Sequence, residues 1–95
     1  MIEEKDKELK LTIYLPFRKF YEDRVKYISI PGINGYFGIL NGHEPIISGT
    51  KSGELQVEDI SGSTLYFDVS PGYLKHTYHT CEIFVEEILE REMDV

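Results

Sequence analysis

The chain has 95 residues and a formal net charge of −7, with 17 acidic and 10 basic side chains. This length allows one domain with a modest core, and the acidic balance argues against a nucleic-acid-binding surface. No apolar run approaches the length of a membrane span, no signal peptide is visible at the charged N-terminus, and a single cysteine, Cys81, excludes an internal disulfide framework. These features fit a cytoplasmic protein.

The first half of the chain predicts strands rather than helices. Residues 1–8 are charged, and we expect them to form a flexible lead-in. Apolar and polar side chains then alternate over residues 9–15, which predicts a strand with one buried face. Further extended segments are expected at residues 17–21 and 25–30, with Glu22-Asp23 as a polar turn between them.

Turn residues divide the rest of the chain into short segments. Residues 31–45 hold four of the eight glycines and two of the four prolines, and Asn41-Gly42 favours a sharp reversal between two short strands. Later turns are expected at residues 51–53, 61–63 and 71–72. Eight or nine short strands spaced in this way predict an all-β fold, an antiparallel β-sandwich or flattened barrel.

The C-terminal segment, residues 86–95, differs in composition because it is rich in helix-forming and charged residues. It is too short to form a stable isolated helix. We therefore expect the β-domain to span residues 9–86 and residues 87–95 to form a charged, solvated tail.

The glycine-rich stretch does not match a phosphate-binding motif. Gly42 is followed by His43 and Glu44, whereas a Walker loop needs Gly-Lys followed by Ser or Thr. Gly32, Gly35 and Gly38 are each three residues apart and no helical pattern follows, which also argues against a dinucleotide fingerprint.

A metal site and a catalytic cysteine are equally weakly supported. On one continuous strand, His79 and Cys81 would face one side and His76 the other, whereas structural zinc needs four convergent ligands. Cys81 fits a small core residue better than a nucleophile, and the carboxylates are scattered. We expect no enzyme activity, no metal and no cofactor.

Tyrosine is abundant, with seven residues in a small chain. Strand propensity accounts for about half of them. The others exceed what a core of this size can hold, and exposed tyrosine is typical of protein interfaces.

The glycine-rich stretch also carries a family resemblance. Residues 31–47, with Gly38, Gly42, His43 and Pro45 in register, are similar to the signature of the epsilon subunit of F-type ATP synthase, which is called delta in mitochondria. Shorter matches at residues 11–15, 52–55 and 70–74 extend the resemblance over about residues 9–87. It implies two packed five-stranded sheets, hence about ten short strands. The C-terminal helical hairpin of most members is absent, so we assign neither ATPase inhibition nor ATP binding; whether the natural protein is short or longer stays open.

The resemblance also implies contact residues. The residues that match the segment facing subunit gamma are His43, Ile46, Ile47 and Ser48. Those that match the loop facing the c-ring are Tyr36 and Phe37, and the residues that shape the stretch are Gly32, Gly35, Gly38, Gly42 and Pro45. Tyr36 stands where the family has an acidic residue, so aromatic packing would replace charge complementarity there. The alternative for His43 is a local hydrogen-bonding brace.

The function implied is that of a non-catalytic rotor-stalk subunit that links gamma to the c-ring and couples ion-driven rotation to ATP synthesis. Its place would be peripheral, on the cytoplasmic face of the bacterial cell membrane, with indirect membrane contact through the c-ring and no nucleic-acid partner. The alternative is a free-standing β-sandwich module that binds a small ligand or a peptide. The coupling ion and self-association stay open.

Overall fold

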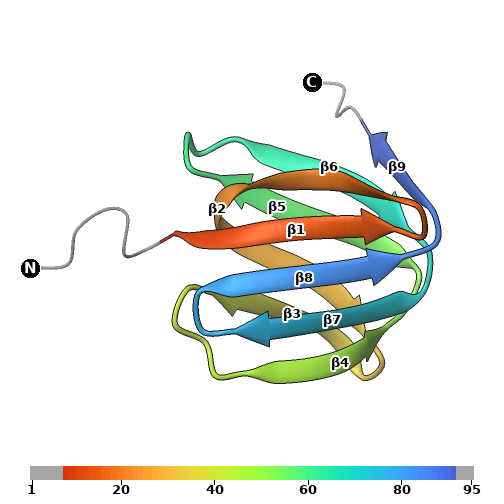
Figure 1. The fold of residues 1–95 in the computed structure, drawn as a ribbon, viewed down its shortest axis with the longest axis horizontal. Coiled ribbons are helices and arrows are strands. Elements are labelled where there is room, and N and C mark those ends of the chain that lie inside the picture. Colours follow the sequence, from red (N-terminus) through yellow and green to blue (C-terminus); the bar gives the residue numbers. More distant parts are fainter. Residues whose placement is uncertain (1–7, 92–95) are drawn as a thin grey trace, which may run out of the picture.

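The computed structural model describes residues 8–91, and these residues form strands and no helix (Figure 1). The strands are β1 (Leu9–Leu15), β2 (Arg18–Gly32), β3 (Gly35–Leu40), β4 (Ile46–Thr50), β5 (Gly53–Asp59), β6 (Thr64–Val69), β7 (Gly72–Thr77), β8 (Thr80–Val85) and β9 (Ile88–Arg91).

Strand β2 belongs to two layers of the fold. Its first half pairs with β1, from Leu15 opposite Arg18 to Leu9 opposite Val25, whereas its second half pairs with β3 and β5. One layer therefore contains the first half of β2 followed by β1, β8, β7 and β4, and the other contains β3, the second half of β2, β5, β6 and β9 (Figure 1). The predicted β-sandwich is confirmed, with five strands in each layer when β2 is counted twice.

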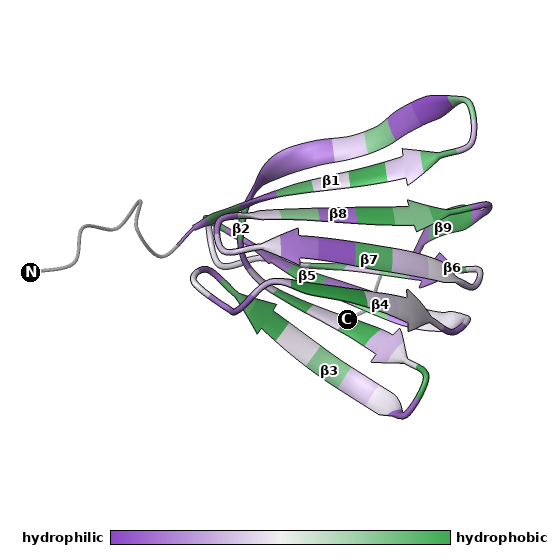
Figure 2. Cartoon of the chain, turned by 60° about the horizontal axis from the view of Figure 1, so that its bottom comes forward, coloured by the Kyte–Doolittle hydropathy of each residue, from purple (hydrophilic) through white to green (hydrophobic). Residues whose placement is uncertain are grey.

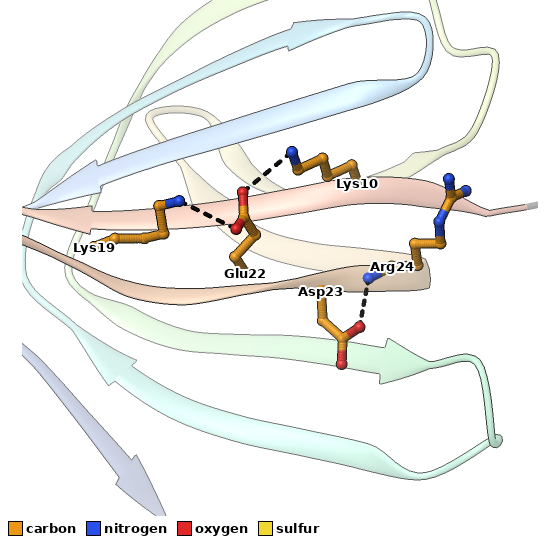
Figure 3. A network of polar contacts seen from close by, with 5 residues as sticks. All are labelled: Lys10, Lys19, Glu22, Asp23 and Arg24. Carbon is orange, nitrogen blue, oxygen red and sulfur yellow. Dashed lines mark hydrogen bonds and ion pairs between the residues drawn. The ribbon is translucent and has the colours of Figure 1, made fainter.

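The expected turn at Glu22-Asp23 is wrong, because both residues lie inside β2, opposite Thr12 and Leu11. The Glu22 carboxylate accepts from Lys19 Nζ at 3.1 Å and pairs with Lys10 Nζ at 3.1 Å (Figure 3). These two lysines lower the pKa of Glu22, the hydrogen bond from Lys19 contributing most. Polar residues are thus accommodated on an exposed strand surface, and two expected strands merge into one of 15 residues.

The sheet is mixed rather than wholly antiparallel. Strands β1 and β8 run parallel, from Lys10 opposite Thr80 to Tyr14 opposite Phe84. Local turn signals could not reveal this pairing, because residues 16–79 separate the two strands.

The sheet continues past the expected end of the domain. Residues Ile88–Arg91 form β9, which pairs antiparallel with β6. Ile88 packs against the core, and the Arg91 guanidinium pairs with the carboxylates of Glu54 and Asp68. Tertiary packing has therefore overridden a weak helix propensity. The expected lead-in at residues 1–7 and the last four residues of the expected tail lie outside the described part.

The core lies between the two layers, and its members alternate along the strands. The buried apolar side chains are Leu9, Leu11, Ile13, Val25, Ile28, Ile30, Ile39, Leu55, Val57, Phe67, Val69, Leu74, Cys81, Ile83 and Val85. Phe67 is the largest of them, and Phe20 and Tyr21 pack edge-on against it with ring centroids at 5.9 and 6.0 Å. Phe67, which belongs to the layer that contains β6, thus packs against the first half of β2 in the other layer.

We expect Phe67→Ala to lower the free energy of unfolding by about 3–5 kcal/mol, because it empties a large site that neighbouring strands cannot close. Phe17→Ala is the matched control: Phe17 is 99% exposed, so its removal should cost less than about 0.5 kcal/mol. Urea unfolding followed by circular dichroism measures both values. Equal losses in the two variants would contradict this account of the core.

Candidate functional site

The loop of residues 41–45 joins β3 to β4 and is anchored to the β7–β8 hairpin. The Gly42 N–H donates to the Tyr78 carbonyl at 2.7 Å, and His79 Nδ1–H donates to Asn41 Oδ1 at 2.8 Å. The backbone of Gly42 has a φ of 89°, a conformation that favours glycine. The reversal predicted from Asn41-Gly42 is confirmed, and hydrogen bonds to the β7–β8 hairpin hold the loop in place.

His43 is held both through its backbone carbonyl and through a local hydrogen bond of its ring. His76 Nε2–H donates to the His43 carbonyl at 3.1 Å, and the two imidazoles meet edge-on at 5.6 Å. The His43 ring donates through Nδ1–H to the carbonyl of Glu44 at 2.7 Å and is exposed. His43 therefore makes the local hydrogen bond expected of a brace, and His76 adds a second one, while the His43 ring stays at the surface.

The predicted facing of His76, His79 and Cys81 is wrong. The chain reverses at Tyr78 and His79, so His76 and Cys81 lie opposite each other on β7 and β8, and both are buried. His79 lies in the turn and is exposed. Within residues 8–91, no three histidine, cysteine or acidic side chains gather closely enough to hold a metal ion.

Burial sets the protonation of the two inward-facing groups. Burial lowers the pKa of His76, although its bond to the His43 carbonyl acts in the opposite direction, and its Nδ1 atom has no hydrogen-bond partner. Burial, with a smaller effect of Glu82, raises the pKa of the Cys81 thiol to about 12. A thiol with this pKa is protonated at neutral pH and is not an activated nucleophile.

Strand β4 divides its side chains between the core and the solvent. Ile46 packs against the core and Ser48 is half-buried, whereas Ile47 is 75% exposed. Pro45 is exposed at the start of the strand. Of the residues that the family resemblance implies for a gamma contact, His43 and Ile47 therefore offer the most exposed surface.

The two aromatic residues predicted for the c-ring contact have different environments. Tyr36 is 58% exposed, and its hydroxyl accepts from the Glu54 N–H at 3.1 Å. Phe37 packs against the core, and a β-carbon at Gly32 would meet its ring at 2.6 Å. Tyr36 lies near the start of β3, whereas His43 follows its end, so the structure does not bring these two residues together.

Gly38 and Gly35 are favoured as glycine for different reasons. A β-carbon at Gly38 would overlap the hydroxyl of Tyr27, which packs across the neighbouring strand. Gly35 follows the β2–β3 turn with a φ of 125°. Both environments favour glycine, that of Gly38 because of the lack of space and that of Gly35 because of its positive φ.

An aromatic row that sequence reasoning missed crosses the outer face of the first layer. Phe84 stacks on Tyr14 at 5.0 Å and on Tyr73 at 4.7 Å, and the three rings line a groove of about 430 Å³. The row depends on the parallel pairing of β1 with β8, so no local sequence signal could have identified it. Tyr14 and Tyr73 in this row account for part of the tyrosine that the core cannot hold.

Residues 8–91 contain no helix of the length and apolarity needed to cross a membrane.

We expect the stability of the fold to fall in mild acid because of His76. Above its ordinary pKa of 6.5, His76 is neutral in the folded and unfolded chains. As the pH falls below that value, the unfolded chain takes the proton first, so stability is lost until the lowered pKa of the folded state is reached. His76→Gln keeps an N–H donor and does not titrate, so its free energy of unfolding should depend less on pH.

Urea unfolding between about pH 7.5 and pH 5 tests this expectation. His79→Gln is the control, because it replaces an exposed histidine of the same hairpin and leaves His76 in place. An unchanged pH dependence in His76→Gln would show that other groups cause the acid sensitivity.

Comparisons with known proteins agree on the family. The family described as "ATP synthase, Delta/Epsilon chain, beta-sandwich domain" matches residues 8–91. The ATP synthase epsilon chain of Chlorobaculum tepidum is 28% identical over 83 residues, which cover 87% of this chain and 94% of the relative. The epsilon chain of Lawsonia intracellularis is 31% identical over 81 residues, which cover 85% of this chain but 60% of the relative. The chain thus spans nearly all of one relative and less than two thirds of the other.

Solved structures show the same fold. A chain in the Euglena gracilis mitochondrial ATP synthase, an assembly of OSCP, F1 and c-ring, superposes with a TM-score of 0.84 at 24% identity, covering 92% of this chain and 56% of that one. A chain in the central stalk and c-ring of the Tetrahymena thermophila enzyme gives a TM-score of 0.70 at 20% identity, covering 85% and 65%. The β-sandwich of residues 8–91 belongs to the delta/epsilon chain family of ATP synthase.

Proposed function

We propose that this chain is a non-catalytic rotor-stalk subunit of an F-type ATP synthase, which binds subunit gamma and the c-ring and couples ion-driven rotation to ATP synthesis. The observation that carries the proposal is the family match, which spans the whole described β-sandwich. The chain would be a peripheral part of the membrane-associated enzyme, on the cytoplasmic face of the bacterial membrane, and would meet the membrane through the c-ring.

The construction of the fold suits a passive mechanical role. The core is continuous between the layers, and β2 runs through both of them. Closely packed interiors have low compressibility and transmit strain. A load applied at one surface would therefore reach the other with little deformation.

The proposed gamma contact consists of His43, Ile46, Ile47 and Ser48. An exposed apolar side chain at Ile47 beside the exposed His43 ring supports this proposal. The loop is fixed by backbone bonds from Gly42 and to the His43 carbonyl. Such a prearranged surface loses little conformational freedom on binding. Ile46 would act indirectly, because it packs inward and supports the strand.

The proposed c-ring contact is centred on Tyr36, with Phe37 as its support from the core side. The bond from the Glu54 N–H to the Tyr36 hydroxyl fixes the phenol while much of the ring remains exposed. An aromatic ring held in this way provides contact area at low entropic cost. This arrangement supports aromatic packing at a position where the family has a carboxylate.

A free-standing binding module is the second candidate. The groove beside Tyr14, Tyr73 and Phe84 favours it, because apolar grooves lined by aromatic side chains are typical binding sites. Among the described residues, Glu86 is the one charged side chain that lines this groove. Binding of a small ligand or peptide there, without affinity for gamma, would favour this candidate.

We expect co-expressed gamma to co-purify with this chain and the double variant His43→Ala, Ile47→Asp to lose it. The substitutions remove the exposed imidazole and place a charge at the centre of the apolar contact, which costs several kcal/mol when a charge is desolvated. Affinity purification followed by gel analysis measures retention.

Ile60→Asp is the matched control, since Ile60 is exposed outside the proposed contact, in the β5–β6 turn. Retention of gamma by a folded double variant would remove the proposed surface. Loss of gamma from Ile60→Asp would show that any added charge disrupts the complex.

For the c-ring, we expect Tyr36→Phe to keep most of the binding and Tyr36→Ala to lose about tenfold or more in affinity. The first variant keeps the ring, whereas the second removes the contact area of an interface aromatic residue. Binding of the purified complex with gamma to detergent-solubilised c-ring measures the difference. A loss in both variants of similar size would assign the contact to the hydroxyl group instead.

A further inference from the structure

The sandwich has four strand edges that lack a full partner among residues 8–91. They are the first half of β2, and strands β9, β3 and β4. β4 pairs with β7 along its length, but on its other side it meets β2 at a single position, Gly32 opposite Thr50. Unpaired edges expose N–H and C=O groups that can pair with another chain.

These edges differ in charge. The first half of β2 carries five charged residues, Arg18, Lys19, Glu22, Asp23 and Arg24, and β9 carries Glu90 and Arg91. The charged part of β2 is the purple strand joined to β1 in Figure 2, and four of its residues appear in Figure 3. By contrast, β3 and β4 contain no charged residue and no proline, and they are pale or green in Figure 2. Charge and proline are the usual protection of edges against pairing, so β3 and β4 lack it.

Because backbone direction alternates along a strand, one known hydrogen bond shows which N–H groups of β4 point away from β7. The Lys51 N–H donates to the Pro31 carbonyl at 2.9 Å, so it points away from β7 and toward β2. Backbone groups alternate in direction along a strand. The N–H groups of Gly49 and Ile47 therefore point to the same side as that of Lys51, along the edge that β7 does not use.

The side chains of this edge favour an apolar neighbour. Ile47 is, after Phe17, the most exposed large apolar side chain of the described residues. Within residues 8–91, the side chain that reaches over Gly49 is that of Ile33, whose Cδ1 would lie 3.0 Å from a β-carbon there. The Ser48 hydroxyl donates to the Gly49 carbonyl at 3.0 Å, a local bond that leaves the N–H groups of the edge unused.

We infer that subunit gamma adds an extended, uncharged segment to the free edge of β4, pairing main chain to main chain with Ile47 and Gly49. This inference rests on the proposed function, because the same strand carries the proposed gamma contact. It goes further by naming the mode of binding: β-strand addition, in which backbone hydrogen bonds give affinity and alternate side chains give specificity. The segment has an apolar residue facing Ile47 and no proline at the paired positions.

The test compares two substitutions at one position. Ile47→Ala removes the side chain and keeps the N–H, whereas Ile47→Pro also removes the N–H, which does not serve the β7 ladder. Proline is tolerated where the N–H of an edge strand faces solvent, so the fold should survive. We expect Ile47→Pro to bind gamma roughly tenfold more weakly than Ile47→Ala, which corresponds to one lost backbone hydrogen bond. Calorimetric titration with purified gamma measures both, and circular dichroism checks the fold.

Hydrogen exchange on the unchanged chain provides a second measurement that needs no substitution. On gamma binding, the amides of Ile47 and Gly49 should exchange at least tenfold more slowly, since they become hydrogen-bonded. The amide of Ser48, which faces β7, serves as the internal control. Its exchange should change much less.

The outcomes separate the two proposals. If gamma binds, but Ile47→Pro behaves like Ile47→Ala and the two amides stay unprotected, strand addition is overturned while the proposed function stands. If gamma does not bind the unchanged chain, both are overturned. Slow exchange of these amides in the free chain, together with a concentration-dependent increase in mass, would assign the edge to a second copy and would also overturn the inference.

Discussion

The long strand β2 is the constraint on which the rest of the structure depends. Its first half supports β1 and its second half supports β3 and β5, so one continuous backbone of 15 residues joins the two layers. Neither layer can shift relative to the other without bending this strand. The side chain of Phe67 reinforces the joint, because it packs from the far layer against Phe20 and Tyr21 of β2. Stiffness is therefore a property of the chain path as well as of the core.

Much of the fold could be predicted from the sequence because its signals are local. Alternation over residues 9–15 and the Asn41-Gly42 reversal correspond to β1 and to the loop before β4. The turn at Ser61-Gly62-Ser63 is also confirmed, and the Asp59 carboxylate stabilises it by accepting from the Ser61 and Ser63 N–H groups at 2.9 and 3.0 Å. These features depend on neighbouring residues and on backbone preferences, which a sequence displays directly.

The errors concern interactions between distant parts of the chain. Glu22-Asp23 has the composition of a turn, but lysines at positions 10 and 19 accommodate Glu22 on a strand. The tail has the composition of a helix, but Ile88–Arg91 form a strand that pairs with the free edge of β6. A single continuous strand would place His76 and Cys81 on opposite faces, whereas the hairpin between them places both on one face. In each case a partner far along the chain, or a reversal of the chain, decided the outcome.

The position of His76 explains how the surface loop can be both exposed and fixed. A loop of five residues that carries a glycine and a proline would normally sample several conformations. Here a buried imidazole donates to the His43 carbonyl, and the Tyr78 carbonyl accepts from Gly42, so the loop is bonded to a hairpin of the sheet. The same hairpin holds β4 through the ladder with β7. The His43 ring and the free edge of β4 therefore share one support, and a force applied to either is passed to the β-sandwich as a whole. A surface built in this way suits a partner that must turn together with the domain, because the fixed loop and strand would deform little under load.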